Sequence, residues 1–124
     1  MKVGIIGLGY WGPNLVRNFL ANSNIKKVYG CDLSEKRLKF ISERYPSVEL
    51  TNSCSDLIKN KDIDIIVIAT PVKTHFEFAF EALNNDKHIW VEKPFTYSVE
   101  EAERLLELSE RKDKVIFVDH TFIY

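Results

Sequence analysis

The stretch that decides the fold is Lys2-Val3-Gly4-Ile5-Ile6-Gly7-Leu8-Gly9-Tyr10-Trp11-Gly12-Pro13, close to the amino terminus. An apolar run leads into three glycines with the spacing G-x-G-x-x-G, and a proline follows where a helix would begin. Gly7 allows a tight turn, Gly9 lets a phosphate approach the backbone, and Gly12 lets the helix pack against the strand. The stretch therefore predicts a strand, a phosphate-binding turn and a helix.

Beyond this stretch, short runs rich in Val and Ile alternate with segments of helical periodicity. We expect six strands, at residues 3–8, 27–31, 48–50, 63–69, 89–91 and 115–118, and five helices between them. The strands show little polar alternation, which is typical of parallel strands buried on both faces. The pattern predicts an α/β fold, a doubly wound parallel sheet of order 3-2-1-4-5-6 with helices on both faces. Three helix starts match the capping-box pattern: Ser53 with Asp56, Thr74 with Glu77, and Ser98 with Glu101.

Composition excludes several classes of protein. The chain has 124 residues, enough for one domain, with 45% hydrophobic residues and a formal net charge of -1, which disfavours nucleic acid and anionic lipid as partners. No apolar run approaches the roughly 20 residues that a membrane span needs. The two cysteines, Cys31 and Cys54, are interpreted as reduced, which favours the cytoplasm, and the three scattered histidines predict no metal site.

Asp32 ends the second expected strand, about 20 residues beyond the glycine motif, and completes a dinucleotide-binding fingerprint. Its carboxylate would accept hydrogen bonds from the hydroxyls of an adenosine ribose and repel a 2'-phosphate, so NAD is expected to bind better than NADP. Two alternatives stay open. Asp32 could instead cap the next helix, paired with Glu35, and Arg37 could either reach a 2'-phosphate or lie in solvent.

Glu92-Lys93-Pro94 ends the fifth expected strand. Because Pro94 cannot donate to a sheet ladder, the chain should leave the sheet there and present Lys93 at the carboxyl edge, where ligands of such sheets bind. Partial burial would lower the pKa of that lysine toward the range useful for proton transfer. A surface lysine at a strand end is the alternative.

The whole chain resembles the amino-terminal domain of the glucose-fructose oxidoreductase, inositol dehydrogenase and MocA family (Gfo/Idh/MocA). The resemblance is carried by residues 7–14, Cys31-Asp32, Ala69-Thr70-Pro71 with Thr74-His75, Lys87-His88 and Val91-Glu92-Lys93-Pro94. Residues 10–14 and the ending 120–124 look most like members that act on sugar nucleotides.

This resemblance implies an NAD(P)-dependent dehydrogenase that oxidises a sugar or sugar-nucleotide alcohol, with Lys93 as the catalytic residue beside the nicotinamide. It also implies that Tyr10 and Trp11 of the glycine motif bind the cofactor. Thr70 and Pro71 would border the adenosine or pyrophosphate, and Glu92 would help to place the nicotinamide ribose. His75 would lie near the cofactor or serve as a capping or packing residue.

The family resemblance further implies a second domain that this chain lacks, carrying substrate contacts and the interface of a homo-oligomer. We expect residues 1–119 to form the cofactor domain and residues 120–124 to begin the connection to that domain, which suggests a fragment of a longer protein. His120 would approach the substrate only if the segment follows the sugar-nucleotide members, and Asp119 stands where many members have glycine. A non-catalytic nucleotide-binding or regulatory module is the alternative function, and a methyltransferase-like fold is disfavoured by the Glu-Lys-Pro motif.

Overall fold

The computed structural model describes residues 1–119, which form one sheet of six strands in the order β3-β2-β1-β4-β5-β6. The strands are β1 (Lys2–Ile6), β2 (Lys27–Cys31), β3 (Glu49–Thr51), β4 (Ile65–Ile68), β5 (His88–Glu92) and β6 (Ile116–Asp119). Each strand runs parallel to its neighbours. The α/β class and the sheet order expected from the sequence are confirmed. Residues 120–124, including His120, lie outside the described part of the chain.

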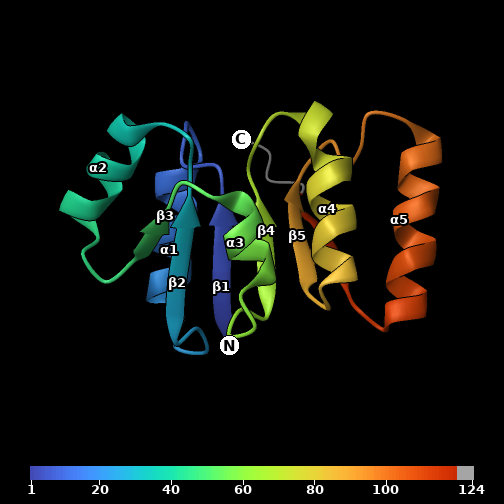
Figure 1. Ribbon diagram of the computed structural model, residues 1–124, viewed down its shortest axis with the longest axis horizontal. Coiled ribbons are helices and arrows are strands. Elements are labelled where there is room, and N and C mark those ends of the chain that lie inside the picture. The colour runs from blue at the N-terminus through green and yellow to red at the C-terminus, as the bar shows by residue number, and fades with distance from the viewer. Residues whose placement is uncertain (120–124) are drawn as a thin grey trace.

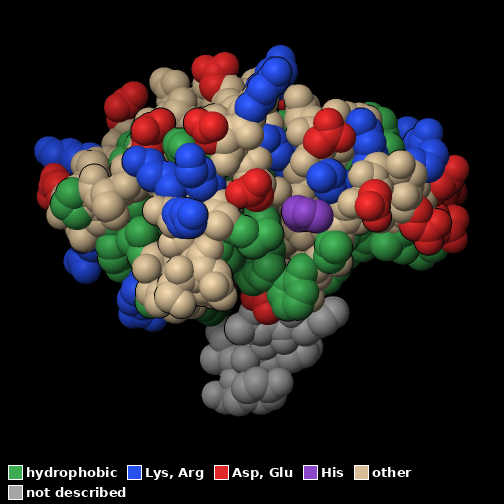
Figure 2. All heavy atoms as spheres, turned by 90° about the horizontal axis from the view of Figure 1, so that it is seen from below, with side chains coloured by type: hydrophobic (Ala, Val, Ile, Leu, Met, Phe, Trp, Pro, Cys, Tyr) green, Lys and Arg blue, Asp and Glu red, His purple; other side chains and the backbone are tan. Residues whose placement is uncertain are grey.

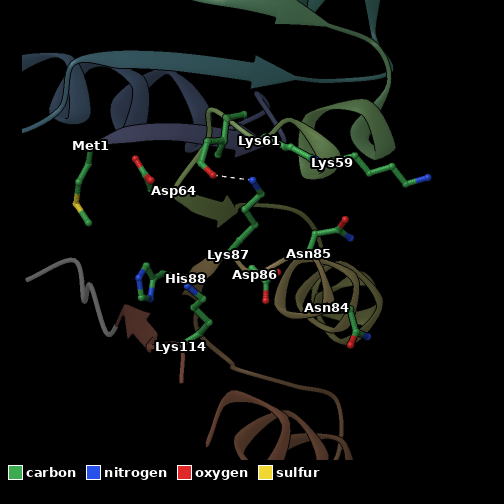
Figure 3. A pocket seen from close by; sticks show the side chains of 11 residues that line it. Met1, Lys59, Lys61, Asp64, Asn84, Asn85, Asp86, Lys87, His88 and Lys114 are labelled. Atoms are coloured by element: carbon green, nitrogen blue, oxygen red, sulfur yellow. Dashed lines mark hydrogen bonds between the residues drawn. The ribbon is translucent and has the colours of Figure 1, made fainter. Parts of the chain in front are cut away.

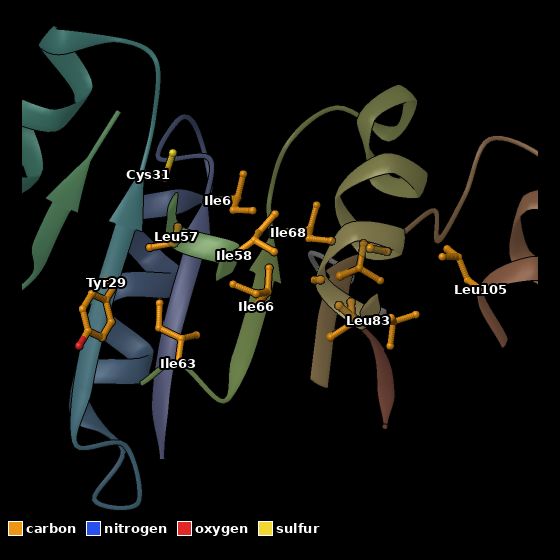
Figure 4. Packing of buried hydrophobic residues seen from close by; sticks show 14 of the residues in the cluster. Ile6, Tyr29, Cys31, Leu57, Ile58, Ile63, Ile66, Ile68, Leu83 and Leu105 are labelled. Carbon is orange, nitrogen blue, oxygen red and sulfur yellow. The ribbon is translucent and has the colours of Figure 1, made fainter. Parts of the chain in front are cut away.

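Helices cover the sheet from both sides (Figure 1). They are α1 (Gly12–Ala21), α2 (Glu35–Arg44), α3 (Cys54–Lys59), α4 (His75–Asn84) and α5 (Val99–Lys112), with a short 3-10 turn, η1 (Val72–Thr74), before α4. One apolar core lies between the sheet and α3, α4 and α5 (Figure 4), and a second lies between β1, β2 and β4 and the helices α1 and α2. Across residues 1–119, the structure contains no helix both long and apolar enough to span a bilayer.

Two of the three expected helix caps are present. The Ser53 hydroxyl accepts from the Asp56 backbone N–H, and the Ser98 hydroxyl accepts from that of Glu101. The expected cap at Thr74 is wrong, because η1 precedes α4 and gives Thr74 a helical backbone rather than the extended one that a capping residue needs. Its hydroxyl instead donates to the Pro71 carbonyl oxygen, at 2.6 Å.

The expected burial of every strand on both faces is wrong at the two edge strands, β3 and β6, neither of which contains a fully buried residue. Trp90 in β5 and Phe117 in β6 pair in register and stack, with ring centroids 6.0 Å apart. Trp90 is only half-buried, and Phe117 is 53% exposed. On the opposite face of β5, Ile89 and Val91 are fully buried under the helices. The doubly wound pattern is therefore complete over the centre of the sheet and open at β6.

The Lys87 side chain connects the residue before β5 to the turn before β4, at the amino-terminal edge of the sheet. Its side chain is buried, and its ammonium donates to the carbonyl oxygens of Asn60 and Ile63, the latter at 2.7 Å (Figure 3). Burial lowers the pKa of Lys87, against the raising effect of Asp64 and other nearby carboxylates. Basic and acidic side chains are mixed over this edge of the molecule (Figure 2). Lys87 therefore serves the fold by pairing two carbonyl groups of the turn that leads into β4.

Replacing Lys87 by Met is expected to lower the free energy of unfolding by about 2 to 4 kcal/mol, because two carbonyl oxygens lose their donor. Met has a similar length, so a new cavity contributes little. Chemical denaturation measures the change, with Lys61→Met at the exposed rim of the same hollow as control, expected to shift stability by less than about 0.5 kcal/mol. Equal stability of Lys87→Met and Lys61→Met would contradict this role.

Candidate functional site

A cleft of about 1460 Å³ opens at the carboxyl edge of the sheet, between the loops that follow β1, β2 and β4. It exceeds the 300–1,000 Å³ or so of ordinary small-molecule pockets. Of the site residues expected from the sequence, residues 7 and 9–11, Asp32, Thr70 and Pro71 line it. The open doubly wound sheet binds its ligands at this edge, where the strand order reverses on either side of β1.

The glycine loop packs backbone against backbone. Gly7 has φ +96°, a conformation that favours glycine, and its N–H donates to the Cys31 carbonyl oxygen at 2.9 Å. A Cβ at Gly7 would lie 2.8 Å from the Ala69 carbonyl oxygen, and one at Gly12 would lie 2.8 Å from the Gly7 carbonyl oxygen. Gly7 and Gly12 therefore hold the turn and α1 against the neighbouring strands.

Gly9 differs from the other two glycines, because no backbone crowds it. The three atoms nearest to a Cβ there all belong to the guanidinium of Arg37, the closest at 3.2 Å, and this group is the far end of a flexible side chain. No side chain caps the start of α1, whose N-cap residue is Trp11. The loop thus presents an accessible backbone next to a helix N-terminus, an arrangement suited to a phosphate.

Tyr10 and Trp11 stand at the rim of the cleft. Their rings meet edge to face, with centroids 4.9 Å apart. Both are exposed, Tyr10 more than Trp11. They offer apolar contact area at the mouth of the cleft, between the glycine loop and solvent.

Asp32 is buried and held by two backbone donors. Its Oδ2 accepts from the Leu8 N–H and its Oδ1 from the Ser34 N–H, each at 2.8 Å. Ser34 is the residue that caps α2, so the alternative of a capping role for Asp32 is wrong. A carboxylate has about four lone-pair sites, and these two bonds leave room for further donors from the cleft.

Arg37 does not simply lie in solvent. Its Nη1 is 3.6 Å from Asp32 Oδ2, and its guanidinium covers the open face of Gly9. The side chain is still 57% exposed, so it can move aside at little cost. Arg37 thereby places a positive charge between the acidic residue and the glycine loop.

His75 joins two loops of the carboxyl edge. The ring is buried, with Nε2 2.7 Å from the Thr70 carbonyl oxygen and Nδ1 2.9 Å from that of Pro94 and 3.2 Å from that of Phe95. It is absent from the cleft lining, and all three partners are carbonyl oxygens. His75 thus fixes the loop after β4 relative to the turn that follows Lys93.

The Glu92-Lys93-Pro94 turn leaves the sheet where expected. Glu92 is the last residue of β5, and burial, followed by the negative charge of Asp119, raises its pKa. The Lys93 N–H donates to the Asp119 carbonyl oxygen at 3.1 Å, and the Lys93–Pro94 peptide bond is cis. Lys93 itself is exposed, so the partial burial expected for it is not seen in residues 1–119.

Several residues that line the cleft were not predicted from the sequence as site residues. Phe78 of α4 faces the cleft beside Thr74, and Cys54 of α3 lies in its wall. Leu33 is 83% exposed and follows Asp32 directly, a position where an exposed apolar residue could have signalled a ligand. Helical spacing sets Phe78 apart from the core-facing side of α4, which predicts an interface with a further domain or a second subunit, whereas in the structure Phe78 lines the cleft and packs partly against the core.

Comparison with known proteins gives consistent matches. Residues 1–120 match the model of the Gfo/Idh/MocA family, described as an oxidoreductase family with an NAD-binding Rossmann fold. Inositol 2-dehydrogenase of Salmonella paratyphi B is 30% identical over 118 residues, covering 92% of this chain and 34% of that protein. The chain spans about a quarter to a third of the length of the curated relatives that it matches.

Solved structures agree on the fold. Biliverdin reductase from Synechocystis, in complex with biliverdin and NADP+, has a TM-score of 0.90 and 28% identity, covering 96% of this chain and 37% of that one. GenD2 from gentamicin A biosynthesis, in complex with NAD, has a TM-score of 0.91 at 21% identity, covering 100% of this chain and 35% of that one, a likeness of fold alone.

Proposed function

The chain belongs to the Gfo/Idh/MocA family of NAD-binding oxidoreductases, and from this membership we propose that residues 1–119 form its dinucleotide-binding domain. In the complete protein this domain binds NAD for hydride transfer with an alcohol of a sugar or sugar nucleotide. Inositol 2-dehydrogenase, a polyol enzyme by name, is among the relatives and supports this substrate class.

One observation carries the proposal: the glycine loop and the Asp32 carboxylate line the same cleft. The Gly9 backbone and the N-terminus of α1 suit a pyrophosphate, because the nearest obstacle is a movable guanidinium. Asp32 keeps lone pairs for two ribose hydroxyls while backbone donors fix its orientation. The residues present therefore fit a dinucleotide, which when bound supplies the hydride acceptor or donor.

The residues proposed to hold the dinucleotide divide by the part that they would contact. Thr70 and Pro71 would border the adenosine or pyrophosphate, with Tyr10 and Trp11 at the rim. Glu92 would help to orient the nicotinamide ribose, because its carboxyl oxygens can accept hydrogen bonds from the ribose hydroxyls. His75 would support these contacts through the backbone of the Thr70 loop.

Lys93 is proposed as the group that binds and deprotonates the reacting hydroxyl. An ammonium offers three donors to a hydroxyl oxygen, and its neutral form can accept the proton that leaves. The position after β5, at the edge where the cleft opens, supports this assignment. The second domain of the complete protein would bury the lysine and bring the substrate to it.

Gly9→Ala is expected to weaken NAD binding about tenfold to a hundredfold while leaving the fold intact, because the added methyl occupies the space of a pyrophosphate and displaces only Arg37. Calorimetric titration with NAD measures the affinity, and thermal unfolding reports the fold. Asn18→Ala, at an exposed position of α1, is the control and should bind normally. Undiminished affinity in Gly9→Ala would remove the glycine loop from the proposed site.

The preference for NAD over NADP rests on charge. A 2'-phosphate about 4 Å from the Asp32 carboxylate would be repelled by roughly 4 kcal/mol at an effective dielectric of 20, and Arg37 offsets part of this. Asp32→Ala is expected to lower NAD affinity about tenfold to a hundredfold, since charge-assisted hydrogen bonds are lost, and to shift the preference toward NADP.

Titrating Asp32→Ala with both dinucleotides gives the ratio of the two affinities. Asp32→Asn serves as the matched variant, because its amide oxygen still accepts from the Leu8 N–H while the charge is gone. A ratio unchanged from the wild type in both variants would refute the assignment. No heat from either dinucleotide with the wild-type protein would refute the proposed function as a whole.

A further inference from the structure

Two thiols meet beneath the proposed coenzyme site. Cys31 ends β2, at the upper edge in Figure 4 of the apolar core between the sheet and the helices α3, α4 and α5, and Cys54 begins α3. Their sulfur atoms are 2.8 Å apart, and both residues border the cleft next to Asp32. An S–S bond is about 2 Å long, so the two sulfurs need to move by less than about 1 Å to bond. We propose that Cys31 and Cys54 form a dithiol that a peroxide oxidises to a disulfide, and that a bound dinucleotide shields it.

The two thiols are not equivalent. The hydrogen bond between the two sulfur atoms raises the pKa of Cys31 and lowers that of Cys54, the latter against burial and the charges of Asp32 and Glu81. Cys31 is fully buried, whereas Cys54 is partly exposed. A peroxide entering the cleft therefore meets Cys54 first, and Cys54 is also the better nucleophile, since the thiolate is the reactive form.

The oxidation proceeds in two balanced steps. The Cys54 thiolate attacks one peroxide oxygen, the O–O bond breaks, and the leaving hydroxide takes up the proton that Cys54 had released, giving a sulfenic acid and one water. Cys31 then attacks the sulfenic sulfur, an S–S bond forms, and the sulfenic hydroxyl leaves with the Cys31 proton as a second water. Two thiols are oxidised by two electrons, and one peroxide is reduced to two waters.

The shielding rests on the proposed function. Cys54 lines the cleft together with Asp32, Leu33, Thr74 and Phe78. An adenosine held by Asp32 would fill the space through which a peroxide reaches Cys54. At a dinucleotide concentration of about 100 times its Kd, about 1% of the sites are free, so oxidation is expected to slow by about a hundredfold.

The test exposes the full chain to a modest excess of hydrogen peroxide and follows intact mass and disulfide-linked peptides with time. We expect the loss of two hydrogen atoms and a peptide that joins Cys31 to Cys54. Cys31→Ala should instead stop at a Cys54 sulfenic acid trapped by dimedone, and Cys54→Ala should react far more slowly, because Cys31 is buried. Over-oxidation of Cys54 in the wild type without an internal bridge, or a disulfide between two chains, would overturn the dithiol.

A second arm repeats the wild-type reaction with saturating NAD, whose binding is first measured by calorimetry. Slower bridging supports the shielding, and an unchanged rate despite measured binding overturns it alone. If NAD does not bind, both the shielding and the proposed function are overturned. The mass change measured without NAD still shows whether Cys31 and Cys54 form a disulfide. Because the experiment measures the covalent oxidation of two sulfur atoms, it does not depend on enzymatic turnover.

Discussion

Gly7→Ala is expected to lower the free energy of unfolding by about 2 to 5 kcal/mol, the largest stability loss at any position of the glycine loop. A side chain at φ +96° is strained by about 1 to 2 kcal/mol. The new Cβ would also lie 2.8 Å from the Ala69 carbonyl oxygen and 2.9 Å from Thr70 Cγ2. Since the first of these atoms is backbone at the end of β4, relief requires β1 and β4 to separate, which adds about 1 to 3 kcal/mol.

Urea denaturation of Gly7→Ala measures the loss, and thermal unfolding should shift downward by roughly 10 to 20 °C for a domain of this size. Gly9→Ala is the matched control in the same loop, because its Cβ meets only the movable end of Arg37. Nearly equal stability of the two variants would show that the loop tolerates a side chain at Gly7, contrary to the geometry of the turn.

Lys93→Met in the complete polypeptide is expected to reduce turnover by about 10²- to 10⁴-fold, the range of a general acid or base, with NAD affinity little changed. A panel of sugars and nucleotide sugars supplies the substrate. Met keeps the length of the side chain and removes both its charge and its proton. Lys39→Met, exposed on α2, is the control and should keep full turnover.

Lys93→Arg separates the two possible contributions of the lysine. Arg retains the charge but does not give up its proton in a protein, so it should restore substrate binding and leave turnover low. If turnover of Lys93→Arg is near that of the wild type, the role of Lys93 is limited to binding the substrate through its positive charge. Unaffected turnover in Lys93→Met would point to the alternative of a nucleotide-binding module in which Lys93 has no chemical role.

Much of the candidate site could be predicted because its signals are local in sequence. The spacing of Gly7, Gly9 and Gly12 is a property of one turn, and Asp32 follows from where the next strand ends. Parallel strands bring their carboxyl ends to one edge, so the junctions after β1, β2 and β4 had to meet there. The predictions that were wrong also have physical causes. Thr74 does not cap α4, because a turn of 3-10 helix precedes that helix. The spacing of side chains does not indicate such a turn.

The sequence by itself determined the class of fold, the order of the strands and the glycine turn with its acidic partner, because periodicity and spacing act over neighbouring residues. Only the tertiary structure decided that Arg37 covers Gly9, that His75 binds carbonyl oxygens on two loops, and that Cys31 meets Cys54. The contact of His75 with Pro94 joins residues 19 positions apart along the chain, and that of Cys31 with Cys54 joins residues 23 positions apart. Such contacts depend on how strands and helices are placed side by side, which no local pattern of residues encodes.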